Sequence, residues 1–352
     1  MSEHGHGHGE HTHDDERRHD HGGVGLLALT RSLFARHSHD PSDSIDDALE
    51  GSRRGIWAVK ISLIGLGATA LVQIVVVLVT GSVALLADSI HNLSDALTAV
   101  PLWIAFVVGR RAASRRYPYG YGRAEDMAGV FIVGMIALSA GVAGYESVRR
   151  LLEPQTVTNL GWVAAAGVIG FIGNETVAIF RIRVGNQIGS AALVADGLHA
   201  RTDGLTSLAV VLGAAGVALG FELADPIIGL LITVAILIVL KDAWRQIWHR
   251  MMDAVDPALL DRAAAAAATA DGVQEVSSVR ARWIGHSLHL DAHIVADCEL
   301  RLSEAHAVGE RARHAMVHAL PKLASATVHV DPCEHEGLDH HTELDHHRPT
   351  FA

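Results

Sequence analysis

The chain has 352 residues, of which 49% are hydrophobic and 19% charged, and its formal net charge is −11. This acidic balance argues against a nucleic-acid partner, because phosphate binding needs a basic surface. The two cysteines, Cys298 and Cys333, are too few to suggest a disulfide framework and fit a reducing compartment.

Both ends of the chain are polar and rich in His, Asp and Glu. The sequence predicts a disordered N-terminal tail over 1–54 and a second His-rich tail over 334–352. Nine histidines fall in the first tail, namely His4, His6, His8, His11, His13, His19, His21, His37 and His39. We interpret them as a weak metal-capturing segment near a cytoplasmic entrance, with a plain solvated tail as the alternative.

Residues 55–250 are dominated by Ala, Val, Leu, Ile and Gly and divide into six apolar segments. Each has about 20 or more residues, which is long enough to cross the hydrocarbon core of a bilayer. The second and fifth are the least hydrophobic because they carry His and Asp. The segments are 55–80, 83–109, 125–149, 157–181, 189–219 and 224–244. The sequence therefore predicts an all-α bundle of six transmembrane helices.

Most of the basic residues near these segments fall on one side if the spans alternate. The opposite side holds only Arg149 and Arg150. The positive-inside rule then predicts an integral, multi-pass membrane protein with both termini in the cytoplasm. The residues on the basic side are Arg53, Arg54, Arg110, Arg111, Arg115, Arg116, Arg123, Arg181, Arg183, Lys241, Arg245 and Arg250.

Residues 255–333 have the pattern of a small soluble domain. The expected order is helix, strand, strand, helix and strand, which predicts a cytoplasmic α+β domain of ferredoxin-like αββαβ type. A sheet this small, covered by helices on one face, often buries its other face against a second copy, so we expect a homodimer. The expected elements are Ala258–Ala270, Val273–Trp283, Ser287–Ala296, Ser303 to about Leu320, and Thr327–Val330.

One sequence motif occurs twice, at Leu85–Thr98 and again 108 positions later at Leu193–Thr206. Both copies lie inside apolar segments, and every ionisable residue of the first recurs in the second. Ionisable groups at membrane depth cost about 2.5–3.5 kcal/mol each, so they persist where they have a partner or a role. The repeat therefore predicts two halves of one site. The repeated residues are Asp88, His91 and Asp95, matched by Asp196, His199 and Asp203.

Residues four apart on a helix share a face, so each copy can offer a histidine and an aspartate to one ion. Two imidazoles and two carboxylates suit tetrahedral Zn²⁺, with Co²⁺ and Cd²⁺ as alternatives, and the loaded site is electrically neutral. Metal and protons compete for these groups, as proton-coupled exchange requires. The predicted ligands are His91, Asp95, His199 and Asp203. We interpret Asp88 and Asp196 as groups that support the ligands or relay protons, or else as solvated helix ends.

These residues and three further motifs resemble the cation diffusion facilitator family over most of 55–333. The further motifs are Tyr117-Pro-Tyr-Gly-Tyr-Gly-Arg123-Ala-Glu125, Ala224-Asp-Pro226 and the C-terminal α+β pattern. The resemblance implies a homodimeric exchanger that moves divalent metal out of the cytoplasm against protons by alternating access. Family members with this His-Asp quartet are mostly zinc transporters.

The resemblance also implies further metal ligands in the cytoplasmic domain, at the dimer interface. The matching positions are His293, His306, His329 and Asp331. Ser277 stands where some relatives place one more histidine, which puts the full binuclear cluster of those relatives in question.

The expected function is proton-coupled export of Zn²⁺ with no resident cofactor, and its partners are metal ions, protons, lipid and a second copy. A membrane-bound metal sensor or scaffold without flux is the alternative, and it leaves the duplicated quartet unexplained. We do not expect an enzyme, because four protein ligands close a metal site that catalysis needs open.

Overall fold

The structure is a computed structural model, and it describes residues 41–80, 99–153, 160–221 and 223–333. The histidines of both tails lie outside the described residues. So does the first copy of the repeat, with Asp88, His91 and Asp95. The fold and the site are therefore built below from the second copy of the repeat and from the C-terminal domain.

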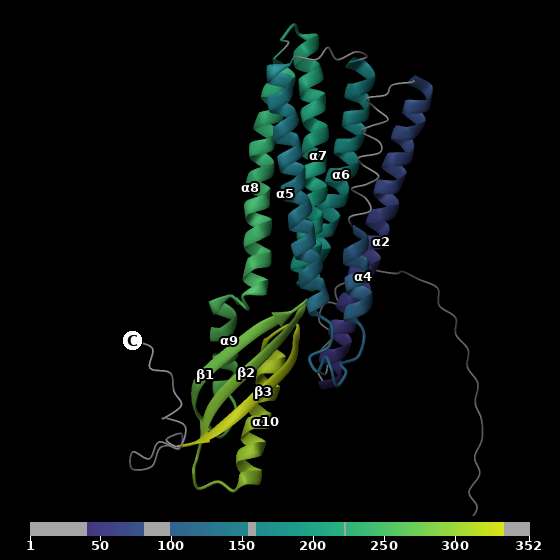
Figure 1. Cartoon of the computed structure of the whole chain (residues 1–352). Coiled ribbons are helices and arrows are strands. Elements are labelled where there is room, and N and C mark those ends of the chain that lie inside the picture. The colour runs from purple at the N-terminus through teal and green to yellow at the C-terminus, as the bar shows by residue number, and fades with distance from the viewer. Residues whose placement is uncertain (1–40, 81–98, 154–159, 222, 334–352) are drawn as a thin grey trace, which may run out of the picture. The chain divides into compact units, whose positions relative to one another are not determined.

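Six helices precede the C-terminal domain in the described part of the chain, and they pack side by side (Figure 1). Stretches within α2, α5, α6 and α8 are long and apolar enough to cross a membrane, and α4 is a shorter apolar helix. The helix α7, which carries Asp196, His199, Arg201 and Asp203, is not among the helices that meet this criterion. The helices are α2 Pro41–Thr80, α4 Ala99–Gly109, α5 Arg123–Leu152, α6 Leu160–Ile188, α7 Ala191–Ala218 and α8 Ala224–Met251.

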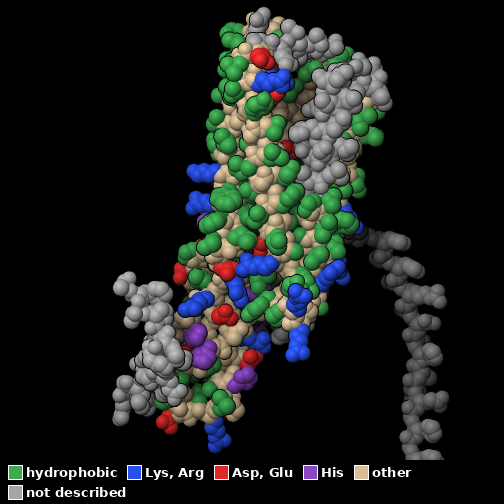
Figure 2. Space-filling model, viewed as in Figure 1, with side chains coloured by type: hydrophobic (Ala, Val, Ile, Leu, Met, Phe, Trp, Pro, Cys, Tyr) green, Lys and Arg blue, Asp and Glu red, His purple; other side chains and the backbone are tan. Residues whose placement is uncertain are grey.

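Among these long helices, α7 has the most protected position. It packs against α5, α6 and α8. Leu193 of α7 belongs to one core cluster with Ile132 of α5 and Ile247 of α8. Large apolar side chains such as Leu138 and Leu231 point outward, and hydrophobic side chains cover the long helices on the face that Figure 2 shows. Polar groups inside and apolar groups outside are the arrangement expected of a bundle in lipid.

Small residues let α6 and α7 approach each other closely. A Cβ atom on Gly197 of α7 would lie 2.7 Å from Cγ1 of Ile182, and one on Gly185 of α6 would lie 2.8 Å from Cγ2 of Val194. Apolar burial between helices gains little in lipid, so close van der Waals packing across such positions is a main source of helix association. These glycines therefore set the distance between α6 and the second copy of the repeat on α7.

Two helices extend beyond the expected spans. The helix α2 begins at Pro41, inside the stretch expected to be a disordered tail, and its buried Ser52 hydrogen-bonds to Nε2 of His286 over 3.3 Å. An Arg54–Glu50 ion pair one turn apart also supports this extension. The helix α6 runs to Ile188, past Arg181, which the sequence placed at the end of its span. The hydropathy pattern predicts that a span ends at its first charged residue. The helix itself can continue past that residue when the charge has a partner.

The C-terminal domain has the expected αββαβ order, so the α+β prediction is confirmed. Strand β1 pairs antiparallel with β2, and β2 pairs parallel with β3, in the sheet order β1-β2-β3. The last strand is longer than expected because its alternating pattern starts directly after the turn at Lys322. The elements are α9 Pro257–Ala268, β1 Val273–Ile284, β2 Ser287–Ala296, α10 Leu302–Ala319 and β3 Leu323–Pro332.

The two helices α9 and α10 cover one face of this sheet (Figure 1). Leu290 and Ile294 of β2 pack there against Ala263 of α9 and Met316 of α10. Side chains alternate along a strand, so the odd-numbered residues of β2, and those of β3 from Ser325 onward, lie on the other, open face. This open face carries His289, His293, Ser325, His329 and Asp331.

Candidate functional site

The second copy of the repeat places a histidine and a carboxylate together inside the helical bundle. His199 and Asp203 lie one turn apart on α7, with Nδ1 of His199 3.7 Å from Oδ1 of Asp203. Their side chains are 1% and 6% exposed. The helix is anchored just before this point by Ser190, whose Oγ accepts a hydrogen bond from Leu193 N–H. This shared, buried face is the one that the four-residue spacing predicts.

The side chains around this pair are also polar. Thr202 and Ser207 of α7 are buried, and so is Asn174 of α6, which lies opposite Gly204. Helix α6 also carries Glu175, whose carboxylate accepts two hydrogen bonds from Arg201 at 3.2 and 2.7 Å. A polar environment of this kind lowers the cost of holding a cation between the helices. The matching half-site, His91 and Asp95, lies outside the described residues.

Asp196, one turn before His199, forms an ion pair that the sequence analysis missed. Its Oδ2 lies 2.9 Å from Nη1 of Arg181 on α6, and the two side chains are 0% and 1% exposed. This burial excludes a solvated helix end for Asp196. The signal was present in the sequence, because an arginine next to an apolar span needs an opposite charge nearby if it is buried.

Three of the four expected cytoplasmic ligands come together on the open face of the sheet. Oδ1 of Asp331 lies 3.0 Å from Nε2 of His329, and its Oδ2 lies 3.6 Å from Nδ1 of His293. One donor atom from each residue fits within 4.8 Å of the others, close enough to hold one ion. Zinc is commonly bound by imidazole and carboxylate donors of this kind.

The fourth expected ligand lies in the same C-terminal domain but away from this cluster. His306 is exposed on α10, next to Val328 and Val330 on the helix-covered side of the sheet. Ser277 does not approach the cluster as a ligand, because its Oγ bonds to the backbone carbonyl of His293 at 3.3 Å. Within one chain, the cluster therefore consists of two histidines and one aspartate.

We expect Asp331→Asn to remove about one bound zinc ion per chain, because a neutral amide is a poor ligand in place of the shared carboxylate. The measurement is equilibrium zinc binding to the full-length protein in detergent. Asp291→Asn is the matched control, since Asp291 is an exposed acid on the same open face of β2. An unchanged zinc count in Asp331→Asn would show that this cluster holds no metal.

Buried acids at the start of α5 bind the turn between β1 and β2. Oε2 of Glu125 lies 2.7 Å from Nδ1 of His286, and Oδ2 of Asp126 accepts the Gly285 N–H at 3.3 Å. Nearby, Arg123 forms an ion pair of 2.6 Å with Asp253, which follows α8. The sequence analysis noted Arg123 and Glu125 only as part of a motif. These contacts join the helical bundle to the C-terminal domain.

Gly285 allows the turn to come this close, and a side chain there is expected to weaken the junction. Its φ is +60°, and a Cβ atom would lie 2.8 Å from the carbonyl oxygen of Gly122. Gly120 has a φ of +77° but open space around it. We expect Gly120→Ala to cost about 1–2 kcal/mol of unfolding free energy from left-handed backbone alone. Gly285→Ala should cost more, as measured by denaturant unfolding of the full chain, and equal losses would contradict a close contact at Gly285.

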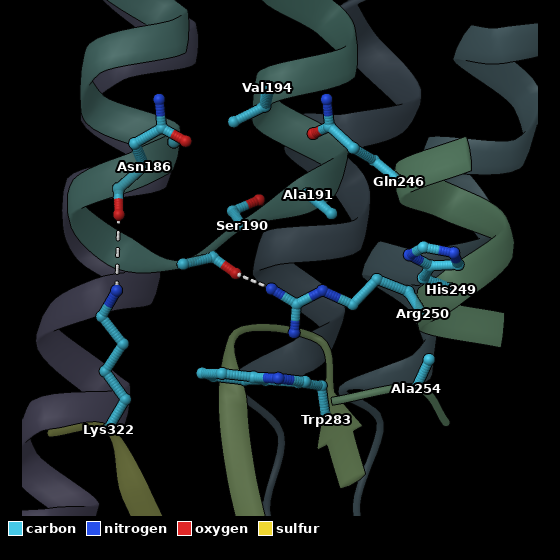
Figure 3. A pocket seen from close by; sticks show the side chains of 12 residues that line it. Asn186, Ser190, Ala191, Val194, Gln246, His249, Arg250, Ala254, Trp283 and Lys322 are labelled. Carbon is cyan, nitrogen blue, oxygen red and sulfur yellow. Dashed lines mark hydrogen bonds between the residues drawn. The ribbon is translucent and has the colours of Figure 1, made fainter. Parts of the chain in front are cut away.

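A cavity of about 370 Å³ lies beside this junction (Figure 3). Arg250, at the end of α8, donates to the carbonyl of Gly189 at 2.7 Å, and its guanidinium lies 4.3 Å from the ring centre of Trp283. Lys322 donates to the carbonyl of Asn186 at 3.4 Å. Burial, and then the nearby Arg250, lowers the pKa of Lys322. Arg250 thus binds the loop between α6 and α7, and Lys322 binds the last turn of α6, so both cations help to hold the start of α7 in place.

The chain matches two family models and several curated proteins. Residues 59–249 match the cation efflux transmembrane domain, and residues 255–333 match the cation efflux protein cytoplasmic domain. A probable cation efflux system protein of Mycobacterium tuberculosis is 59% identical over 318 residues, covering 90% of this chain and 96% of that protein. The magnetosome protein MamB of Paramagnetospirillum magneticum is 27% identical, covering 72% of this chain and 86% of that protein.

A further protein and a solved structure also match the chain. Metal tolerance protein 2 of Oryza sativa is 26% identical over 325 residues, covering 84% of this chain and 82% of that protein. Among solved structures, a variant of MamM is 28% identical over 22% of this chain and 84% of its own, with a TM-score of 0.21.

Proposed function

The chain belongs to the cation efflux family, and on this premise we propose that it exports Zn²⁺ from the cytoplasm in exchange for protons. Membership makes it an integral membrane protein that moves metal cations and not an enzyme. The observation that carries the finer proposal is the buried pair of His199 and Asp203 in α7. Such a pair inside a membrane bundle is costly unless it has a cationic partner or a role.

Zinc is the proposed substrate because of the donor types. Imidazole nitrogen favours Zn²⁺ and its neighbours among the transition metals over Mg²⁺, Ca²⁺ and Mn²⁺, which prefer oxygen donors throughout. His91 and Asp95 recur at the same spacing in the first copy of the repeat. We assign these two and the α7 pair as the four ligands, a set that suits tetrahedral Zn²⁺, with Co²⁺ and Cd²⁺ as further substrates.

Proton coupling follows from the same groups. Ligands must be deprotonated to bind metal, so metal binding releases protons and protons release metal. With zinc bound, two carboxylates balance the divalent charge. Without it, the buried carboxylates take up protons, because bare charges are unfavourable at this depth. Each state of the site is thus close to neutral, which allows the helices to rearrange with the site either loaded or empty.

The orientation and assembly are part of this proposal. The arginines and lysines flanking the spans favour termini in the cytoplasm, and export is then movement away from that side. The open face of the C-terminal sheet, together with the family's dimerisation domain, favours a homodimer. His306, on the other side of the sheet from the cluster, stays a predicted ligand and would have to reach a metal through that dimer.

The proposal is tested by zinc flux in proteoliposomes under an imposed pH gradient. We expect zinc uptake to follow the gradient, to reverse when the gradient is reversed, and to be accompanied by proton movement in the opposite direction. Zinc flux that persists unchanged after a protonophore collapses the gradient would reject proton coupling while leaving transport intact. Absence of flux from folded, zinc-binding protein would favour a sensor.

A metal sensor is the second candidate, and one observation favours it. The cluster of His293, His329 and Asp331 lies in the C-terminal domain, outside the helical bundle, where it can respond to zinc without moving it. A sensor requires no flux, so it would keep its biological activity when His199 and Asp203 are replaced. The exporter would lose its activity in the same variants.

A further inference from the structure

The only two cysteines of the chain lie next to each other where β2 and β3 of the C-terminal sheet end. Asp297 and Cys298 follow β2, and Cys333 follows β3. Because β2 and β3 are parallel, their C-terminal ends lie side by side at the same end of the sheet. Cys333 N–H donates to the carbonyl of Ala296 at 2.9 Å, which extends the pairing by one residue. The backbone therefore positions both thiols.

The side chains converge as well. The two Sγ atoms are 2.8 Å apart, and the N–H of Cys298 donates to Sγ of Cys333 at 3.3 Å. One carboxylate oxygen of Asp297 lies with both sulfurs in a set of donors that are all within 4.8 Å of one another. The turn holds this carboxylate in place, because Oδ1 of Asp297 accepts the Glu299 N–H at 2.9 Å.

We infer that Asp297, Cys298 and Cys333 form a binding site for a thiophilic divalent cation, Zn²⁺ or Cd²⁺. Two thiolates and one carboxylate match the preference of these ions for sulfur with a further nitrogen or oxygen donor. A backbone N–H directed at a sulfur also fixes the orientation of that sulfur as a ligand. Cations that prefer oxygen donors throughout gain nothing from such a pair.

Binding requires only a small local movement. Zinc–sulfur bonds of about 2.3 Å in a tetrahedron hold two sulfurs roughly 3.8 Å apart. The two Sγ atoms would therefore separate by about 1 Å, which side-chain rotation at a strand end can supply. Both thiols are half-buried, and Asp297 is exposed, so an ion can enter from solvent.

This site, beyond the strand ends, is separate from the histidine cluster on the open face. Cys333 is two residues beyond Asp331, which is roughly 7 Å along a strand. The histidine cluster has no sulfur donor, and the cysteine site has no imidazole among the described residues. The two sites should therefore differ in metal preference, with Cd²⁺ favoured at the sulfurs. The inference is independent of the proposed transport function.

The test is a Cd²⁺ titration of the reduced full-length protein in detergent, without oxygen. The readout is the ultraviolet charge-transfer absorption of thiolate–cadmium bonds. Because the chain has no other cysteine, the signal can come only from this pair. We expect saturation at one Cd²⁺ per chain, with both thiols protected from alkylation at least tenfold.

The variants separate this site from its neighbours. Cys298→Ser and Cys333→Ser should each remove most of the absorption, whereas His329→Ala and Asp203→Asn should keep it. Two alkylatable thiols with no absorption change would overturn the inference. Saturation at one Cd²⁺ per two chains would also overturn it, since the site would then lie between molecules.

Discussion

Replacing Asp203 with asparagine is expected to lower zinc-for-proton exchange about 100-fold. The amide keeps the shape of the carboxylate and removes its charge, so the zinc-loaded site would carry a net positive charge inside the bundle. An uncompensated charge at that depth costs about 2.5–3.5 kcal/mol, which corresponds to roughly two orders of magnitude in occupancy. The measurement is the initial rate of zinc uptake into proteoliposomes with a fixed pH gradient.

The matched control is Asp242→Asn, an exposed carboxylate on α8 that is remote in sequence from both copies of the repeat. We expect it to transport at a rate close to that of the wild type. Purification yield and unfolding midpoint should be similar for both variants, which would show that the loss is not one of folding. If Asp203→Asn exported zinc as fast as the control, the transport site would have to be assigned to other residues.

The α7 half of the site could be predicted from sequence because its geometry is local. A helix places residues four apart on one face whatever surrounds it, and the structure has His199 and Asp203 in that relation. The α+β domain could be predicted for a similar reason. Side chains alternate between the two faces of a strand, so the alternation of apolar and polar residues in β2 indicates both the strand and its covered face. Resemblance to a family added the positions of His293, His329 and Asp331.

Contacts between distant segments could not be predicted in the same way. Glu125 and His286 are 161 residues apart, and their 2.7 Å contact depends on where the C-terminal domain meets α5. Arg181 was placed at the end of a span because hydropathy treats any charge as a boundary. His306 was grouped with the other ligands by resemblance, whereas α10 holds it on the opposite side of the sheet.

Removing Asp196 is expected to destabilise the bundle more than removing any exposed acid. Asp196→Asn leaves the guanidinium of Arg181 buried without its counter-charge, and breaking a buried pair in this way costs about 3–5 kcal/mol. The control is Asp225→Asn, which breaks a pair of similar length, 2.9 Å to Arg150, whose side chains are 21% and 39% exposed. That change should cost about 1 kcal/mol or less. Denaturant unfolding in detergent measures both.

A double variant separates a structural role of Asp196 from proton transfer. In Arg181→Met with Asp196→Leu, both charges are gone, so the stability should return to within about 1–2 kcal/mol of the wild type. If Asp196 serves mainly to neutralise Arg181, this variant should also exchange zinc for protons at an unchanged ratio. If its stability returns but zinc flux no longer follows the pH gradient, Asp196 carries protons as well. Equal losses in Asp196→Asn and Asp225→Asn would instead show that the ion pair contributes little to the packing of α6 against α7.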